Sequence, residues 1–349
     1  MLEKQERKRY SRQILLPEMG LSGQEKLKAA KVLVVGAGGL GCPVLQYLAA
    51  AGVGAIGIVD DDLVDITNLH RQILYTSGDI GQNKALTAAE KLSALNPFVK
   101  ITPYPVRLSE ENAETILKNY DLIIDGSDNF ITRYLVNDFC IKLGKPFVFG
   151  SILRFEGQVS VFNFQNGPTY RCLFPDFSEE DNCAEAGVIG ILPGMIGTYM
   201  ANEAIKVITG IGEPLSGKLL VINALTNTTS IFQFSRSVNA GAAANFQVQE
   251  PEPTPKPSVS EISWEAFESL QQAHPEKVEL IDVREPHEFE ADGFGGVNIP
   301  LSEIPDHLHS FAAGKTVIFY CNTGKRSLRA ATLLVESGFE GQSFWGQNW

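Results

Sequence analysis

The segment Lys31-Val-Leu-Val-Val-Gly-Ala-Gly-Gly-Leu-Gly41 decides the fold of the first two thirds of the chain. It begins with a short valine-rich run, which is typical of a buried parallel strand. Residues 42–51 then carry apolar side chains at helical spacing. A strand, a glycine loop and a helix in this order predict a phosphate-binding loop, because the backbone can approach a phosphate and the helix N-terminus attracts its charge. The loop glycines are Gly36, Gly38, Gly39 and Gly41.

A second apolar strand, residues 55–59, ends at Asp60. This acidic residue lies about 20 positions after the loop, where a ribose hydroxyl is commonly bound. The pattern therefore predicts a nucleotide without identifying it. A nicotinamide-dependent oxidoreductase and a glycine-rich turn without a ligand remain alternatives at this point.

Composition narrows the class of protein. The 349 residues are enough for two domains, and 44% of them are hydrophobic, which suits globular cores. The net charge of −12 argues against nucleic acid or an anionic membrane as a partner. No apolar run is long enough to span a membrane, no signal peptide is recognisable, and the five cysteines are widely scattered. We expect a soluble, reduced, cytoplasmic protein.

The order of elements predicts a Rossmann-like mixed α/β sheet with a parallel core. Strands and helices alternate up to residue 150, a hairpin follows over residues 151–164 with Gly157 near its turn, and two closing strands lie at 219–223 and 230–234. We expect a nucleotide-binding domain over residues 1–245, a Pro-rich linker over 246–259 and a smaller α/β domain over 260–349.

Four charged residues follow strand ends or open the next helix in the large domain. They are Asp60, Arg71, Lys84 and Asp128. In an open α/β sheet such positions converge on one crevice at the carboxyl edge. Two cations beside a glycine loop suit a triphosphate, and a nearby carboxylate suits Mg²⁺ held through the phosphates.

The large domain resembles the MoeB/ThiF/HesA family, which is similar to the adenylating core of ubiquitin-activating enzymes. The resemblance covers roughly residues 5–235 and implies a homodimer that uses ATP to adenylate the C-terminal Gly-Gly carboxylate of a small ubiquitin-like sulfur carrier. The motifs that carry it are Arg9-Tyr-Ser-Arg12-Gln-Ile, the glycine loop, Val59-Asp60-x-Asp62, Asn68-Leu-His-Arg71-Gln, Gly81-Gln-Asn-Lys84, Asp125-Gly-Ser-Asp128-Asn and Cys183-Ala-Glu-Ala-Gly.

The resemblance also implies roles for individual residues. Asp60, next to Asp62, would hold the ribose, Arg71 and Lys84 the phosphates, and Asp128 the Mg²⁺. Arg12 would reach the nucleotide across the dimer interface, and Asn68 matches a further active-site position. Cys183 matches a cysteine that some members use in a covalent carrier or sulfur intermediate, and an ordinary buried cysteine is the alternative.

The family usually binds zinc through two Cys-x-x-Cys pairs. Here Thr169-Tyr-Arg-Cys172 keeps one sulfur of the first pair, and no counterpart of the second follows between residues 222 and 248. Four soft ligands cannot be assembled, so a structural Zn²⁺ site is predicted to be absent. We expect Cys42, Cys140 and Cys172 to be ordinary buried residues.

In the small domain Cys321 follows a predicted strand, residues 316–320, and precedes a predicted helix, residues 328–337. Such a loop makes an anion nest, and Lys325 and Arg326 add positive charge, so we expect a reactive thiolate. The loop resembles the active site of single-domain rhodaneses, as do Asp282-Val-Arg284-Glu and Val297-Asn-Ile-Pro-Leu301, which implies a persulfide on Cys321. A cysteine phosphatase would have one more residue between cysteine and arginine, and a buried structural cysteine is the remaining alternative.

Together the two halves predict an adenylyltransferase fused to a sulfurtransferase. The carrier would leave as a thiocarboxylate for molybdopterin, thiamine or thiolated tRNA, with a cysteine desulfurase or thiosulfate as sulfur donor. A thiamine-pathway adenylyltransferase, a nicotinamide-dependent oxidoreductase and a non-catalytic carrier-binding scaffold are the alternatives. The oxidoreductase leaves Arg71, Lys84 and the Cys321 loop without a role.

Overall fold

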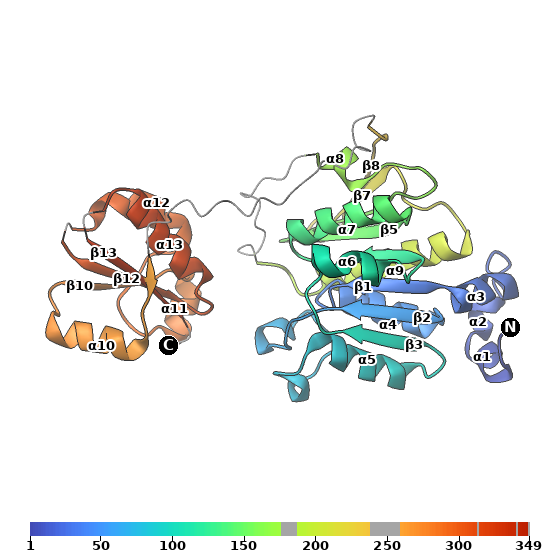
Figure 1. The fold of residues 1–349 in the computed structure, drawn as a ribbon, viewed down its shortest axis with the longest axis horizontal. Coiled ribbons are helices and arrows are strands. Elements are labelled where there is room, and N and C mark those ends of the chain that lie inside the picture. Colours follow the sequence, from blue (N-terminus) through green and yellow to red (C-terminus); the bar gives the residue numbers. More distant parts are fainter. Residues whose placement is uncertain (176–186, 238–258, 313, 340, 348–349) are drawn as a thin grey trace. The chain divides into compact units, whose positions relative to one another are not determined.

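The computed structural model describes residues 1–175, 187–237, 259–312, 314–339 and 341–347 (Figure 1). The chain divides into two compact units, Met1–Ala244 and Asn245–Trp349, and each is described by itself. Cys183 and nearly all of the predicted linker lie outside the described residues. No helix in the described ranges has both the length and the apolar character needed to cross a membrane.

The large unit is built on an eight-stranded sheet in the order β3-β2-β1-β4-β5-β6-β7-β8. The first five strands are parallel and the last three join antiparallel, which confirms the predicted mixed sheet with a parallel core. β3 contains Pro103, which cannot donate to a ladder, and accordingly lies at the sheet edge. The strands are β1 (Lys31–Val35), β2 (Ala55–Val59), β3 (Lys100–Tyr104), β4 (Leu122–Asp125), β5 (Phe147–Leu153), β6 (Glu156–Phe162), β7 (Lys218–Asn223) and β8 (Thr228–Gln233).

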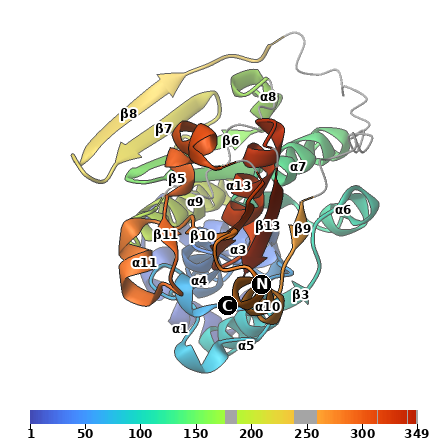
Figure 2. The same ribbon diagram turned by 90° about the vertical axis from the view of Figure 1, so that its left-hand side faces the viewer.

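Helices cover both faces of this sheet because the central strands are apolar on both sides (Figures 1 and 2). In β1, Val32 and Val34 face one core with α4, α5 and α9, whereas Leu33 and Val35 face a second core with α6 and α7. The helices are α1 (Lys4–Arg9), α2 (Ser11–Ile14), α3 (Gly20–Ala29), α4 (Gly41–Ala51), α5 (Lys84–Leu95), α6 (Glu110–Leu117), α7 (Phe130–Leu143), α8 (Tyr170–Leu173) and α9 (Leu192–Thr209), with short 3-10 turns η1 (Ile66–Asn68) and η2 (Ser77–Asp79).

The predicted hairpin exists, with its turn at residues 154–155, two residues before Gly157. β5 continues through Ser151 to Leu153, and the chain reverses at Arg154, whose φ is +54°. Gly157 lies inside β6, where a Cβ would come within 2.2 Å of the Ile196 side chain on α9. Its role is therefore close packing of a helix on the sheet and not the turn itself.

The small unit is a five-stranded, all-parallel sheet in the order β11-β10-β12-β13-β9. Two hydrophobic clusters lie on its two faces, around Phe319 and Tyr320 respectively. The elements are β9 (Ser260–Glu261), β10 (Val278–Asp282), β11 (Val297–Asn298), β12 (Thr316–Cys321), β13 (Gln342–Gln347), α10 (Trp264–Ala273), α11 (Pro286–Asp292), α12 (Ile304–His307), α13 (Lys325–Glu336) and the turns η4 (Leu301–Glu303) and η5 (Leu308–Ser310).

The helix after Cys321 begins earlier than predicted, at Lys325 instead of Leu328. Gly324 has φ +77° and forms the N-cap, so the chain enters the helix only three residues after the strand. Lys325 and Arg326 therefore lie in the first turn of α13 and not in a free loop.

A buried ion pair connects β10 to the segment after it. Arg284 donates to both Asp282 oxygens at 2.8–3.1 Å, and the two side chains are 1% and 0% exposed. Arg284 also donates to the Asp292 carboxylate at 2.8 Å. The Asp292 carboxylate is 71% exposed, so this second contact lies at the surface above the buried pair.

We predict that Arg284→Ala destabilises the small unit by about 3–5 kcal/mol, because the Asp282 carboxylate would stay buried without its cation. All three tryptophans of the chain lie after residue 263, so tryptophan fluorescence during urea unfolding reports on this unit alone. Lys315→Ala is the control, since Lys315 pairs with Glu279 at a half-exposed position and should cost less than about 1 kcal/mol. Equal losses in the two variants would contradict the prediction.

Candidate active sites

The glycine loop of the large unit is packed directly against the loop after β4. A Cβ on Gly36 would lie 2.9 Å from the Gly126 carbonyl oxygen, and one on Gly41 would lie 2.0 Å from the Gly36 oxygen. The Gly126 N–H also donates to the Val35 carbonyl at 2.9 Å. The carboxyl ends of β1 and β4 thus meet at one edge of the sheet, as parallel strands require.

Asp60, Asp62 and Lys84 come together at this edge. Asp60 accepts the Ala37 N–H at 2.7 Å and the Asp62 N–H at 2.9 Å, so the glycine loop is tied to the end of β2. Burial raises the pKa of Asp60, and the Ala37 hydrogen bond and the charge of Lys84 oppose that rise. Lys84 is 5% exposed and its Nζ lies 2.9 Å from the Asp62 carboxylate. An ammonium group is therefore fixed beside the loop.

Arg71 and Asn68 form a second polar group there. Arg71 donates to the Asn68 amide oxygen at 2.9 Å, and a Cβ on Gly39 would lie 3.7 Å from Arg71 Cδ. Burial lowers the pKa of Arg71, while the negative charge of exposed Asp128 opposes the shift. The structure thus brings both predicted cations and the predicted carboxylates to one region.

Two buried residues, Asp125 and Arg133, support this region through Ser127, and their roles were not predicted from the sequence. The Asp125 carboxylate accepts the Ser127 N–H at 3.0 Å and its hydroxyl at 2.6 Å, while Arg133 donates to the Ser127 carbonyl at 3.3 Å. Burial raises the pKa of Asp125, and Arg133 opposes the shift. The two residues hold the segment that carries Asp128 from below.

Gln72 is a further residue that the sequence analysis missed. It is buried, it donates to the Asn68 amide oxygen at 3.2 Å, and a Cβ on Gly38 would lie 3.5 Å from its nitrogen. Its own amide oxygen has no hydrogen-bond partner within the described part of the chain. Gln72 is the last residue of the motif Asn68-Leu-His-Arg71-Gln, and this position was the one feature of the sequence that could have indicated it.

Carboxylates dominate the possible metal ligands. Within the described ranges, the one cluster of three ligand-bearing residues that could hold an ion is Asp60, Asp61 and Asp62. Carboxylate oxygens at the edge that carries Asp128 are donors that suit Mg²⁺. Cys42 and Cys140 are buried as predicted, but Cys172 is only half-buried and accepts N–H groups from Thr169 and Ser237 at 3.3 and 3.4 Å.

Arg12 does not contact the residues beside the glycine loop in the described part of the chain. It lies exposed on α2 and makes no hydrogen bond to the site residues in the described part of the chain. Its predicted role across a dimer interface therefore stays a prediction. The same holds for Cys183, which lies outside the described residues.

In the small unit Cys321 ends the central strand β12 and is 2% exposed. Its Sγ lies 3.4 Å from the Ser327 N–H and 3.3 Å from the Ser327 hydroxyl. That hydroxyl is also within 2.9 Å of the Gly346 carbonyl, which links the loop to β13. A sulfur at a strand end, met by an N–H from the first helical turn, is in a position to act as a nucleophile.

The two guanidinium groups near this loop are both paired with carboxylates. Arg326 meets Glu288 of α11 through two hydrogen bonds of 2.7 and 3.0 Å. Arg284 donates to the Asn322 amide oxygen at 2.8 Å while it holds Asp282. The sequence indicated that Arg326 adds positive charge to the loop, and its carboxylate partner could not be predicted from local pattern.

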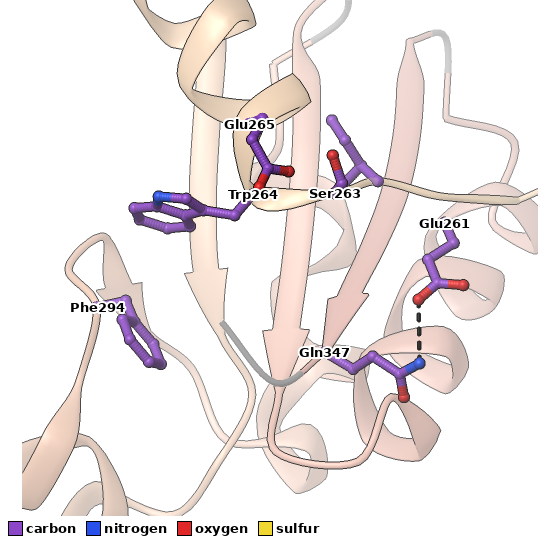
Figure 3. Close-up of a pocket in the computed structure, with 7 residues that line it drawn as sticks. Glu261, Ser263, Trp264, Glu265, Phe294 and Gln347 are labelled. Atoms are coloured by element: carbon purple, nitrogen blue, oxygen red, sulfur yellow. Dashed lines mark hydrogen bonds between the residues drawn. The ribbon is translucent and has the colours of Figure 1, made fainter.

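A pocket of about 650 Å³ opens beside the Cys321 loop (Figure 3). Trp264 and Phe294 lie on one side of it, and Gln347 donates to Glu261 at 3.0 Å on the other. A Cβ on Gly324 would lie 2.6 Å from the Gln347 side-chain oxygen, so the pocket adjoins the loop. Its lining consists of Glu261, Ile262, Ser263, Trp264, Glu265, Phe294 and Gln347.

Comparison with known proteins agrees with both resemblances. The ThiF family model matches residues 10–242, and the rhodanese-like domain model matches residues 264–344. A sulfur carrier protein adenylyltransferase of Thermus thermophilus is 57% identical over 64% of this chain and 85% of its own. The probable adenylyltransferase/sulfurtransferase MoeZ of Mycobacterium tuberculosis is 41% identical over 97% and 90% of the two chains. A probable molybdopterin-synthase adenylyltransferase of Porphyra purpurea is 40% identical over 95% and 89%.

Solved structures agree on the fold of the large unit. The Escherichia coli protein MccB with a bound MccA variant has a TM-score of 0.60 at 22% identity and covers 67% of this chain and 73% of its own. MccB with ATP has a TM-score of 0.58 at 21% identity, over 65% and 75%. The predicted adenylation fold is thereby confirmed. With its nucleotide-type loop and its Cys321 domain, this chain belongs to the ThiF family and carries a rhodanese-like domain after the family domain.

Proposed function

We propose that this protein adenylates the C-terminal carboxylate of a small ubiquitin-like sulfur carrier with ATP and then replaces the adenylate with sulfur supplied through Cys321. One observation carries the first half: Lys84 and Arg71 are positioned beside a glycine loop at the carboxyl edge of a parallel sheet. Molybdopterin biosynthesis is the pathway we favour, because relatives that match nearly the whole chain include molybdopterin-synthase adenylyltransferases.

The adenylation step needs alignment and charge neutralisation. A carrier carboxylate oxygen attacks the α-phosphorus of ATP, the bond to the β-phosphate breaks, and pyrophosphate leaves. Lys84 and Arg71 offset the phosphate charge, and backbone N–H groups of the glycine loop orient the nucleotide. Asp60 accepts the ribose hydroxyl, for which its carboxylate retains lone pairs beyond its two backbone partners. Asn68 and Gln72 keep Arg71 in place.

Asp128 is the group that would hold Mg²⁺, which would offset the charge of the phosphates when bound. A structural zinc ion is not part of the proposal. We further propose a homodimer in which Arg12 reaches the partner's nucleotide. The exposed Leu15 and Leu16 close to Arg12 on the same surface segment support that placement.

Sulfur transfer follows in the second half. The terminal sulfur of a persulfide on Cys321 attacks the carrier's acyl-adenylate carbon, and AMP leaves, which gives an acyl disulfide between the carrier and Cys321. A second thiol then attacks the Cys321 sulfur, the sulfur–sulfur bond breaks, and the carrier thiocarboxylate leaves with the electron pair. A small cellular thiol reduces the disulfide that remains on Cys321. The donor that loads Cys321 is a cysteine desulfurase or thiosulfate, and Cys183 is the thiol we assign to a covalent intermediate of this stage. Because Cys321 must cycle as a free thiol, a reducing compartment such as the cytoplasm suits the reaction.

We predict that Lys84→Met lowers carrier-dependent ATP–pyrophosphate exchange by about 100-fold or more, because a fixed positive charge at the phosphates is lost. Lys91→Met is the matched control. Lys91 lies on the same helix, α5, and pairs with Asp79 at 2.6 Å. The prediction is wrong if Lys84→Met retains exchange within a few-fold of the unmodified protein, or if the control loses as much.

We also predict that Cys321→Ser leaves ATP–pyrophosphate exchange unchanged and abolishes labelling of the protein by thiosulfate carrying ³⁵S in its sulfane position. Serine cannot form a persulfide, and Cys321 belongs to the unit that follows the adenylation domain. Cys172→Ser serves as the control, since that half-buried thiol belongs to the large unit. Retained labelling in Cys321→Ser would assign the sulfur to another cysteine.

A further inference from the structure

The charge of the Cys321 loop is neutralised within the small unit itself. Arg326, in the first turn of α13, forms two parallel hydrogen bonds with Glu288, which belongs to α11. Both side chains are about one quarter exposed, so the pair lies at the edge of the site and solvent reaches it. The geometry is the fork-to-fork pairing by which guanidinium groups bind anions.

The other guanidinium that contacts the loop is also paired, whereas Arg329 lies exposed one turn further along α13. Arg284 is held by Asp282 and by Asp292. Lys325 is exposed to solvent, where a charge is strongly screened. A dianion that approaches Cys321 therefore meets a guanidinium that a carboxylate already occupies.

We propose that Glu288 is a specificity-determining residue for the sulfur donor. Its carboxylate occupies the guanidinium group of Arg326. A dianionic donor such as thiosulfate must therefore compete with this carboxylate for Arg326. A donor without that charge, such as a persulfide on a cysteine side chain, carries no such penalty. This inference rests on the proposed role of Cys321 as sulfur acceptor.

The chemistry shows where Arg326 matters. The Cys321 thiolate attacks the sulfane sulfur of thiosulfate, the sulfur–sulfur bond breaks, and sulfite leaves with the electron pair. The product is the Cys321 persulfide. Sulfite carries off two negative charges that only a free cation could offset. With a persulfide donor the leaving group is a single thiolate, so Arg326 is needed less.

The pair persists over the working pH range. Its hydrogen bonds with Arg326 lower the pKa of Glu288 to about 2. A carboxylate whose pKa is lowered stays ionised above its ordinary value of about 4.5 and loses its charge only as the pH falls toward 2. The discrimination between donors is therefore expected to be constant between about pH 6 and 9.

The test is Glu288→Gln in the full chain. Glutamine keeps an oxygen that can accept the Glu285 N–H, which Glu288 now accepts at 3.1 Å, but it carries no charge. We expect the KM for thiosulfate to fall by about three- to tenfold, with little change for the persulfide of N-acetylcysteine amide, a donor without a carboxylate. Glu290→Gln, an exposed residue of the same helix, is the matched control and should change neither value.

A second measurement does not depend on turnover. The alkylation rates of Cys321 by iodoacetate and by iodoacetamide, followed by mass spectrometry of the Cys321 peptide, compare an anion with a neutral probe of similar size. We expect Glu288→Gln to raise the iodoacetate-to-iodoacetamide ratio by a similar factor. Equal effects on charged and uncharged reagents would overturn the proposal and leave Glu288 as a residue that only positions Arg326.

Separate outcomes contradict the specificity role of Glu288 and the sulfur-acceptor role of Cys321. If the unmodified protein and Glu288→Gln both take sulfur on Cys321, but with unchanged donor preference, the specificity role is wrong and the proposed function stands. If neither forms a Cys321 persulfide from either donor, the proposed function of the small unit is wrong, and the specificity role falls with it.

Discussion

The close approach of two backbone loops is the constraint on which the nucleotide-type site depends. Gly36 and Gly126 pack so closely that neither loop could accommodate a Cβ on Gly36 without moving. This contact brings the ends of β1 and β4 together, while Asp60 ties the end of β2 to the same loop through the Ala37 N–H. Residues far apart in the chain, Lys84 and Asp128 among them, become neighbours of one glycine loop as a result.

Charge is distributed differently in the two units. In the large unit Lys84 and Arg71 face acidic partners that are largely exposed, Asp62 and Asp128, so solvent screens these partners more than it screens the cations. In the small unit Arg326 is held through two hydrogen bonds by the carboxylate of Glu288, which belongs to another helix, α11. The first arrangement suits a highly charged phosphate substrate, and the second suits a donor with little charge.

Local patterns predicted the fold and most of the candidate site well. Glycine spacing, strand ends and the Cys321 loop are short-range signals, and they led to Asp60, Arg71, Lys84 and Cys321. The pattern did not show that Gly157 serves helix packing, and it placed the start of α13 three residues too late, because Gly324 turns the chain early. The carboxylate partner of Arg326 escaped it, since that contact arises only when α11 and α13 pack together.

The central claim is that one chain couples ATP chemistry in its first unit to sulfur chemistry at Cys321. The most direct test is the intact mass of a Gly-Gly-ending sulfur carrier after incubation with this protein, Mg²⁺ and a persulfide donor, with and without ATP. The account predicts conversion of the C-terminal carboxylate to a thiocarboxylate only when both ATP and the donor are present. Thiocarboxylate that forms without ATP would contradict the account. So would a carrier whose mass stays unchanged when ATP and the donor are both present.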